Sequence, residues 1–513
     1  MRRPGKQSRT IDFILETERS LASYLGREPS LERRRVIRQL TREPVLPMTV
    51  IPDLTAVEMA ALAEYLPVVR GVAIQPRNER IHPFPGMLTH VLGYTGRDQP
   101  GSEELLDDYP RAYTTPELIG RSGLEAAFDQ ELRGAAGMQL LEVDSVGYAH
   151  SSHGADTPPR HGNDLYLTID LKAQRIAEEL LRGYSGALVL LDSETGAVLA
   201  MASSPTYDLA SLSGEAIARL SKDTEHLPLM NRATRGLYTP GSIMKPLLAL
   251  CALETHPELA AEHYVCEGKY MIGNHSIRCA RTWGHGELDL AGAITVSCNP
   301  FFIHLGLEVG IDDYSEFLKT AGLGEHSGIE IGDAMGVRPD RAAAQRLWKK
   351  NWIAVDTAYA ALGQGAITIT PLQAAVFTAA LANGGSLLRP YLVKEIRTQD
   401  GALLMSGQSV VRSRLPASQA NLGVVQQAMR QAVVERGGSA HGLADACIPL
   451  AAKTGTAEVG DLASRHKNTW VIAFGPADQP KYALACVIER GQSGGRTAVP
   501  IAFDFFQKWL GAE

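Results

Sequence analysis

Three short strings in the chain carry residue types that together can perform acyl transfer. The first, Ser242-Ile243-Met244-Lys245, places an amine three residues after a hydroxyl. Turn-forming residues precede it and an apolar run follows it, so we expect Ser242 at the start of a helix with Lys245 on the same face. A desolvated lysine can take the proton of a serine hydroxyl and so create a nucleophile. The alternative is a capping serine followed by a surface lysine.

The second string, Ser297-Cys298-Asn299, supplies a hydroxyl and an amide. We expect Ser297 to relay a proton between Lys245 and a leaving amine, and Asn299 to hold the substrate backbone. The alternative for both residues is helix capping.

The third string is Lys453-Thr454-Gly455, followed by Thr456. Lys453 can bind a carboxylate by its charge, the two threonines add hydroxyl donors, and Gly455 lets the strand approach a substrate closely. The backbone N–H groups of Ser242 and Thr456 are the natural pair to stabilise an oxyanion. The alternative for Lys453 alone is an edge-strand lysine that faces water.

A second Ser-x-x-Lys string, Ser464-Arg465-His466-Lys467, gives the chain an internal control. Polar residues flank it, so we interpret Ser464 as a loop residue without a catalytic role. Ser-x-Asn and Lys-Thr-Gly each occur once. Their order and uniqueness favour the acyl-transfer hypothesis over a chance match.

The elements that can position these strings begin after residue 163. Apolar runs at 186–192 and 196–201 flank Ser193-Glu194-Thr195, which predicts a hairpin. Further strands are predicted at 470–474 and 482–488, with the Lys453 string as another and an amphipathic helix at 499–510. Strands at both ends of a helix-rich segment predict an α+β domain with a five-stranded antiparallel sheet flanked by helices.

The first 150 residues have a different character. Segment 11–42 is charged and helix-permissive, and its arginines at 33–35 are predicted to form a solvated helix face. Residues 151–163 are rich in Ser, His, Pro and Gly, which is typical of a linker. We therefore expect a smaller N-terminal pedestal at 1–150, a linker at 151–163 and a catalytic domain at 164–513.

Composition narrows the possible classes of protein. The chain has 513 residues, of which 45% are hydrophobic and 21% charged, with a net charge of −7. These values indicate a globular protein and give no electrostatic footprint for nucleic acid. No run approaches the roughly 18 apolar residues of a membrane span. The basic residues near Met1 lead into no long apolar region, so we expect neither a signal peptide nor an anchor.

The three strings, in this order, resemble class B penicillin-binding proteins, which are peptidoglycan D,D-transpeptidases. The resemblance covers residues from about 160 to the end well, and the preceding part weakly. Gly363-Gln364-Gly365 is similar to the elongation branch, penicillin-binding protein 2. Other matching segments are Gly120 to Gly134, Leu167-Thr168-Ile169-Asp170, Gly284-His285-Gly286 and Thr370-Pro371-Leu372-Gln373.

The resemblance implies a mechanism and partners. Ser242 would attack the D-Ala–D-Ala bond of a stem peptide and release D-Ala, and an amine from a neighbouring strand would resolve the acyl-enzyme. β-Lactams would acylate Ser242, and no cofactor would be required for the chemistry. The expected partner is a polytopic membrane glycosyltransferase at the outer face of the cytoplasmic membrane. Family members usually begin with a membrane helix and an extended Arg-Gly segment, and neither is recognisable here: Met1 is an internal start, the chain is shortened, or the protein has no anchor.

Two other functions remain open from the sequence. A β-lactamase or D,D-carboxypeptidase would share the three strings, but the large N-terminal part and Thr370-Pro371-Leu372-Gln373 favour a biosynthetic enzyme. A penicillin-binding scaffold or sensor would need no turnover, and the intact strings disfavour it. The lifetime of a penicilloyl adduct distinguishes these functions.

Four metal-ligating side chains lie close to the second string: Cys266, Cys279, His285 and Cys298. Three thiols and an imidazole make a candidate set of tetrahedral zinc ligands, although they lie farther apart in the sequence than the cysteines of a Cys-x-x-Cys motif. Some elongation-type relatives carry zinc in this region, and that resemblance favours a structural zinc over a Cys266–Cys279 disulfide or free thiols. Cys251 and Cys486 lie in apolar runs and are predicted to be core residues.

Overall fold

The fold was analysed in a computed structural model of the chain. It describes residues 6–42, 48–66, 71–74, 80–97, 118–137, 141–143, 149–152, 157–460 and 465–511. Two compact units are present. The first consists of residues 1–81, 96–119 and 136–160, and the second of residues 82–95, 120–135 and 161–513, so the chain passes between them more than once.

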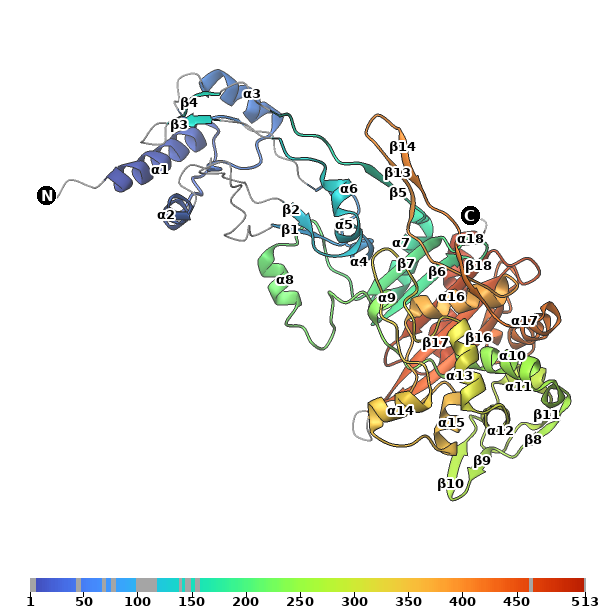
Figure 1. Cartoon of the computed structure of the whole chain (residues 1–513). Coiled ribbons are helices and arrows are strands. Elements are labelled where there is room, and N and C mark those ends of the chain that lie inside the picture. Colours follow the sequence, from blue (N-terminus) through green and yellow to red (C-terminus); the bar gives the residue numbers. More distant parts are fainter. Residues whose placement is uncertain are drawn as a thin grey trace. The chain divides into compact units, whose positions relative to one another are not determined.

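The described residues of the first unit form helices α1, α2 and α3 and a short hairpin of β3 and β4 (Figure 1). Helices α1 and α2 pack through Ile11, Leu15 and Val36, while the arginines at 33–35 on α2 are exposed, as predicted. Thr55 caps α3 through a reciprocal pair of hydrogen bonds with Glu58. The bounds are α1 Lys6–Tyr24, α2 Arg33–Arg42, α3 Ala56–Tyr65, β3 Leu141–Val143 and β4 Ala149–Ser152; β1 Thr95–Arg97 pairs with β2 Leu118–Gly120 where the chain crosses between the units.

The second unit is built on a five-stranded antiparallel sheet in the order β16-β17-β18-β6-β7. The predicted hairpin and terminal strands are confirmed. Because the sheet is covered on both faces, its strands read as nearly continuous apolar runs. The bounds are β6 Gly186–Asp192, β7 Val198–Ser204, β16 Ala451–Val459, β17 His466–Gly475 and β18 Tyr482–Ile488.

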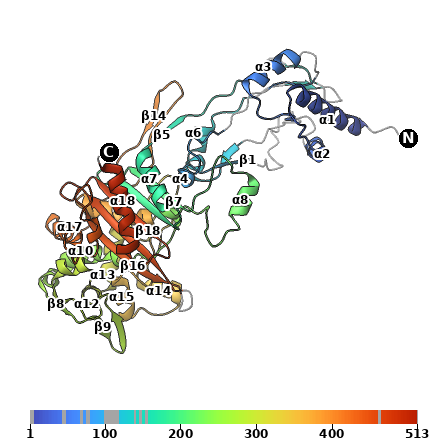
Figure 2. The same ribbon diagram turned by 180° about the vertical axis from the view of Figure 1, so that it is seen from behind.

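Alternate residues of each strand enter two separate hydrophobic cores. Ala187 and Val189 of β6 face a core that includes α10 and α16, whereas Leu188 and Leu190 face a core with α7 and α18. Figure 2 shows the face of the sheet that α18 covers. The helices that form these layers are α7 Leu171–Leu181, α10 Lys245–Thr255, α16 Pro371–Ala382 and α18 Val499–Leu510. Cys251 and Cys486 are fully buried, one in each core, as predicted.

The remaining elements surround this framework. Helices α11 Leu290–Val296, α12 Asn299–Val309 and α15 Ala354–Ala361 complete the lobe beside α10. Other helices are α4 Thr89–Leu92, α5 Gly123–Ala127, α6 Asp129–Arg133, α8 Gly214–Leu220, α9 Arg232–Arg235, α13 Ile311–Thr320, α14 Arg341–Trp348 and α17 Gln419–Val434. Other strands are β5 Asp164–Leu167, β8 Tyr264–Cys266, β9 Lys269–Ile272, β10 His275–Arg278, β11 Gly286–Leu288, β12 Ser386–Leu388, β13 Val393–Arg397, β14 Leu403–Ser406 and β15 Val411–Arg414. Among the described residues, no helix combines the length and hydropathy needed to cross a membrane.

Candidate active site

Ser242 lies in a tight 3₁₀ turn, Gly241–Met244, that runs directly into α10. Gly241 has a φ of 62°, and its N–H donates to the carbonyl of Gly363 at 2.8 Å. A Cβ atom on Gly241 would lie 2.9 Å from the carbonyl oxygen of Thr456. Glycine is therefore required where the serine turn meets the third string, and it brings the backbone of Ser242 next to that of Thr456.

Lys245 is completely buried at the first residue of α10. Its Nζ donates to the Ser297 carbonyl at 2.9 Å, the Ser297 hydroxyl at 3.3 Å and Asn299 Oδ1 at 2.8 Å. Burial lowers the pKa of Lys245 to about 8 despite the opposing effect of nearby thiols. An appreciable fraction of Lys245 is therefore neutral near neutral pH, as a general base requires.

Ser297 occupies the junction between α11 and α12, with a left-handed φ of 60°. This conformation is uncommon for a residue with a Cβ and is typical of functional sites. Its hydroxyl is 2.8 Å from Lys453 Nζ as well as 3.3 Å from Lys245 Nζ. The three strings therefore meet at one oxygen atom.

Lys453 projects from β16, the edge strand of the sheet, yet it is completely buried. Its Nζ donates to the Ser297 hydroxyl and to the carbonyl of Thr454. Burial, with the nearby positive charge of Lys245, holds the pKa of Lys453 well below its ordinary value. A bound carboxylate would restore the charged form, so the site is arranged to attract an anion.

Asn299 starts α12 and joins Lys245 to the end of β10. Its Oδ1 accepts the hydrogen bond from Lys245, and its Nδ2 donates to the carbonyl of Arg278 at 3.1 Å. The second hydrogen on Nδ2 remains for a substrate carbonyl. The sequence did not predict this contact with Arg278. The acceptor is a backbone carbonyl, which every residue type carries.

The loop before Ser242 is anchored to the sheet by a second contact that the sequence did not predict. Trp470 on β17 donates its indole N–H to the carbonyl of Thr239 at 3.0 Å. Gly455 lies opposite Trp470 in the strand register, and a Cβ there would approach Pro240 and Ile243. Glycine at position 455 therefore allows β16 to pack closely against the turn that carries Ser242. Ser464 lies outside the described residues.

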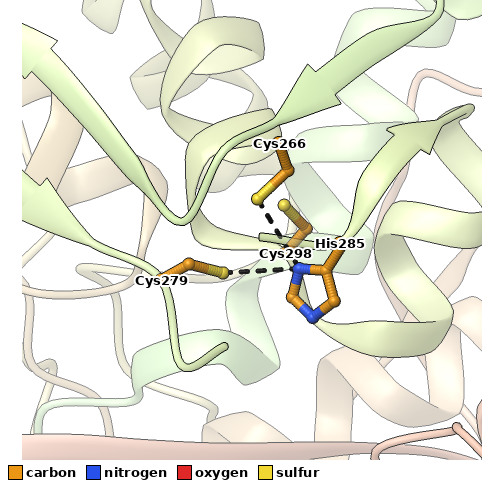
Figure 3. A group of neighbouring side chains, drawn as sticks. All are labelled: Cys266, Cys279, His285 and Cys298. Carbon is orange, nitrogen blue, oxygen red and sulfur yellow. Dashed lines mark hydrogen bonds between the residues drawn. The ribbon is translucent and has the colours of Figure 1, made fainter. Parts of the chain in front are cut away.

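Cys266, Cys279, His285 and Cys298 converge beside this site (Figure 3). Cys266 ends β8, Cys279 follows β10, His285 precedes β11 and Cys298 lies between α11 and α12. Their four potential ligand atoms lie within 4.8 Å of one another. His285 Nδ1 is 3.7 Å from Cys266 Sγ and 3.5 Å from Cys279 Sγ. All six cysteines of the chain are free thiols in the structure.

The geometry and chemistry of this cluster fit zinc. Tetrahedral zinc with ordinary Zn–S and Zn–N bonds separates sulfur from nitrogen by about 3.6 Å. A hydrogen bond with Cys279 and burial both raise the pKa of Cys298, since several thiolates cannot coexist there without a cation. A Cβ on Gly284 would lie 2.0 Å from the Cys266 carbonyl, so glycine is needed for His285 to turn toward the thiols.

Comparison with known proteins agrees with these features. Residues 186–507 match the penicillin binding protein transpeptidase domain, and residues 4–167 match the penicillin-binding protein dimerisation domain. The peptidoglycan D,D-transpeptidase MrdA of Acinetobacter baumannii is 30% identical over 482 residues, which cover 89% of this chain and 70% of that protein.

Solved structures show the same similarity. The complex between PBP2 and MreC from Helicobacter pylori matches with a TM-score of 0.82 and 26% identity, over 99% of this chain and 92% of that one. A peptidoglycan synthase complex described as coordinating polymerization and crosslinking matches with a TM-score of 0.75 and 28% identity, over 94% and 86% of the two chains. With the transpeptidase match spanning most of the second unit around the three strings, the chain belongs to the penicillin-binding protein transpeptidase family.

Proposed function

We propose that this chain is a peptidoglycan D,D-transpeptidase of the elongation type that works through an acyl-enzyme on Ser242. One observation carries the mechanism: the Ser297 hydroxyl lies within hydrogen-bond distance of both Lys245 and Lys453. This arrangement connects a base, a proton relay and a carboxylate-binding cation at one point. The similarity to MrdA supports the choice of substrate.

Acylation follows from these positions. Neutral Lys245 takes the Ser242 hydroxyl proton while Oγ attacks the carbonyl carbon of the penultimate D-Ala. The backbone N–H groups of Ser242 and Thr456 stabilise the negative oxygen of the tetrahedral intermediate. The C–N bond then breaks as a proton passes through the Ser297 hydroxyl to the nitrogen of the departing D-Ala. In the structure the Lys245 amine hydrogen-bonds Ser297 and Asn299, which places the base next to the proton relay.

Lys453 prepares the site for this chemistry. The terminal carboxylate of the donor peptide binds Lys453 and the hydroxyls of Thr454 and Thr456, and this anion favours the ammonium form of Lys453. A charged Lys453 then disfavours a second charge on Lys245, which keeps the base neutral. Substrate binding and activation of Ser242 are thereby coupled.

Deacylation completes the transfer. The amine of a second stem peptide attacks the ester carbonyl and gives up a proton as the C–O bond to Ser242 breaks, so Oγ regains its hydrogen. The reaction takes place at the outer face of the cytoplasmic membrane, where the peptidoglycan substrate lies. The first unit would bind the partners, and a membrane glycosyltransferase that makes the glycan strand is the partner we propose. The match to a synthase complex supports that assembly.

A zinc ion held by Cys266, Cys279, His285 and Cys298 is also proposed, with a structural role. When bound, it would neutralise the thiolates and fix the end of β10, at Arg278, against Asn299. It takes no part in the acyl transfer. Metal analysis of protein purified without chelator should give about one zinc per chain, and less than about 0.2 would contradict the assignment.

Labelling with a fluorescent penicillin tests the catalytic proposal. A stable label on the parent protein, with release of D-Ala and cross-linked product from a stem-peptide donor and acceptor, is the expected result. A label that disappears within seconds would indicate a β-lactamase. Release of D-Ala with no cross-linked product would indicate a D,D-carboxypeptidase, and a label without turnover of peptides would indicate a scaffold or sensor.

A further inference from the structure

Helix α2 of the first unit carries a basic face that the acyl-transfer mechanism does not use. The helix spans Arg33–Arg42, and its first turn contains arginines at 33–35 and no acidic residue. The chain as a whole is acidic, with a net charge of −7. The concentration of positive charge on one short helix therefore contrasts with the rest of the molecule and calls for a physical explanation.

The opposite side of α2 is fixed in the core of the first unit. Val36 is completely buried and packs with Ile11 and Leu15 of α1. At the edge of this contact, Arg33 Nη1 donates a hydrogen bond of 2.6 Å to Asp12 Oδ1. These contacts between α1 and α2 determine which side of α2 is left exposed.

The exposed side of α2 presents Arg34, Arg35 and Arg38, which we call the α2 arginine face. All three residues are exposed, and none forms an ion pair or a side-chain hydrogen bond within the part of the chain that the structure describes. Arg34 and Arg38 are four residues apart, so they are neighbours on the helix surface. Ile37 is 41% exposed. The face therefore offers three free guanidinium groups together with one apolar side chain.

This placement of charge is unfavourable for the helix itself. The N-terminus of a helix carries a partial positive charge, so cations in the first turn are destabilising there. Arg34 and Arg35 lie in that turn, with no acidic residue to offset them. Two like charges four residues apart, as at Arg34 and Arg38, are also destabilising. Contacts within the described part of the first unit do not compensate these charges, whereas a bound anion would.

The chemistry of the face favours phosphate as that anion. Guanidinium groups bind phosphate oxygens through two parallel hydrogen bonds, and they are more weakly hydrated than ammonium groups. Arg34, Arg35 and Arg38 extend over more than one turn of the helix, so they can engage several phosphates at once. A surface that carries many phosphates therefore fits the face better than a single free phosphate ion.

The small apolar content of the face favours a lipid surface over a protein partner. A stable protein interface covers about 800 Å² on each partner and has an apolar or aromatic centre. On α2 only Ile37 is an exposed large apolar side chain among the described residues. A phospholipid surface presents phosphates that adjust to a convex helix, with an apolar layer beneath them that Ile37 can enter.

We propose that the α2 arginine face binds the headgroups of anionic phospholipids, with Ile37 entering the interface between headgroups and acyl chains. The inference rests on the proposed function for its location alone, since that function places the protein at the outer face of the cytoplasmic membrane. It uses no part of the acyl-transfer chemistry. The binding gives the first unit a membrane contact of its own.

Co-sedimentation of the full chain with vesicles tests the proposal. One set of vesicles contains phosphatidylcholine alone, and the other contains equal parts of phosphatidylcholine and phosphatidylglycerol. We expect binding to the vesicles with phosphatidylglycerol and not to the others. Binding should weaken as salt is added, because salt screens charges at a surface.

Charge variants locate the effect. The double variant Arg34→Gln, Arg38→Gln should reduce the partition coefficient about 25-fold, since each basic residue near an anionic surface contributes about fivefold. The control Arg219→Gln, Lys222→Gln removes the same charge from exposed residues at the end of α8 and just after it, and it should leave binding unchanged.

Two further measurements separate lipid binding from a structural role of the arginines. Arg34→Lys, Arg38→Lys keeps the charge and should bind within about threefold of the parent. Denaturant unfolding of Arg34→Gln, Arg38→Gln should show stability equal to or above that of the parent, because the substitutions relieve repulsion within α2. A structural role would instead lower stability in the glutamine variant.

The outcomes separate this inference from the proposed function. A parent protein that penicillin labels but that binds neither set of vesicles, or both equally, would overturn the lipid assignment alone. Equal losses of binding in the α2 variant and the α8 control would also overturn it. Binding of soluble polyglutamate without binding of vesicles would overturn it in favour of an acidic protein partner. Vesicle binding by a parent that no penicillin labels would overturn the acyl-enzyme proposal and leave the lipid site standing.

Discussion

Asn299 Nδ2 donates a hydrogen bond of 3.1 Å to the carbonyl oxygen of Arg278. Arg278 directly precedes Cys279, and Asn299 directly follows Cys298, so this bond joins the thiol cluster to the catalytic site. The same amide accepts from Lys245 through Oδ1. A change in the position of the thiols can therefore alter the position of Lys245 through the Asn299 side chain.

Loss of one of the proposed zinc ligands should affect both the stability of the protein and its acylation. We expect Cys279→Ser to lower the zinc content, to lower the Tm by at least about 5 °C and to slow penicillin labelling about tenfold. Cys447→Ser is the control, because Cys447 is an exposed thiol outside the cluster. Calorimetry, metal analysis and labelling kinetics check this; unchanged zinc content and Tm in Cys279→Ser would contradict the assignment.

The two Ser-x-x-Lys strings should respond differently to mutation. Ser242→Ala should abolish penicillin labelling, because Ser242 carries the hydroxyl at the start of α10, in the turn that packs against Thr456. Ser464→Ala should be labelled like the parent. Mass spectrometry of the labelled protein locates the adduct, and an adduct that survives in Ser242→Ala would show that the nucleophile lies elsewhere.

Acylation should increase with pH through the titration of Lys245. Burial lowers the pKa of this amine to about 8, so its neutral, proton-accepting fraction is small at pH 6 and large at pH 9. Penicillin acylation rates measured from pH 6 to 9.5 should rise with a midpoint near 8. Lys245→Arg should lose at least about a thousandfold at every pH, since a guanidinium stays protonated throughout. A flat profile for the parent would argue against Lys245 as the base.

Gly241 packs closely against the carbonyl of Thr456. We therefore expect Gly241→Ala to be more harmful than a glycine-to-alanine substitution at an open position of a helix. Gly241→Ala would place a Cβ 2.9 Å from the Thr456 carbonyl at a φ of 62°, so we expect a loss of about 1–3 kcal/mol and labelling slowed at least tenfold.

Gly423→Ala provides the matched comparison. Gly423 lies within α17, and a Cβ there would have nothing within 4 Å. We expect this substitution to raise stability by about 0.5–1 kcal/mol without affecting labelling. Denaturant unfolding and labelling rates test the pair; equal effects of the two substitutions would show that the Thr456 contact is unimportant.

The sheet could be predicted from the sequence because its strands are local apolar runs. β6, β18 and α18 have the predicted bounds. β7 begins at Val198, two residues later than expected, because Gly196 adopts a φ of 81° and still belongs to the turn. The order of the three strings indicated a shared site, but their distances apart had to come from the fold. The cluster of Cys266, Cys279, His285 and Cys298 could be proposed from residue types, and the structure brings these four side chains together.

Other contacts left no pattern in the sequence. The carbonyls of Arg278 and Gly363 act through the backbone, so residue type does not identify them. Asn468, Glu489 and Tyr238 meet only because β17 and β18 lie beside the loop before Ser242. Such groupings depend on long-range strand register, which single-residue patterns do not encode.

The strand order of the sheet also determines when the second unit can fold during synthesis of the chain. β6 pairs with β18, and just beyond this pairing Ser193 donates to the carbonyl of Pro480, 287 positions along the chain. The N-terminal hairpin β6–β7 therefore has no partner strand until almost the whole polypeptide has been synthesised. Contacts of such long range slow folding and leave an open edge exposed in the meantime. Lys453 lies on β16, which is synthesised long after Ser242 and Lys245. An incomplete chain therefore contains Ser242 and Lys245 but lacks Lys453. We expect the nascent protein to be inactive until its last strands have paired.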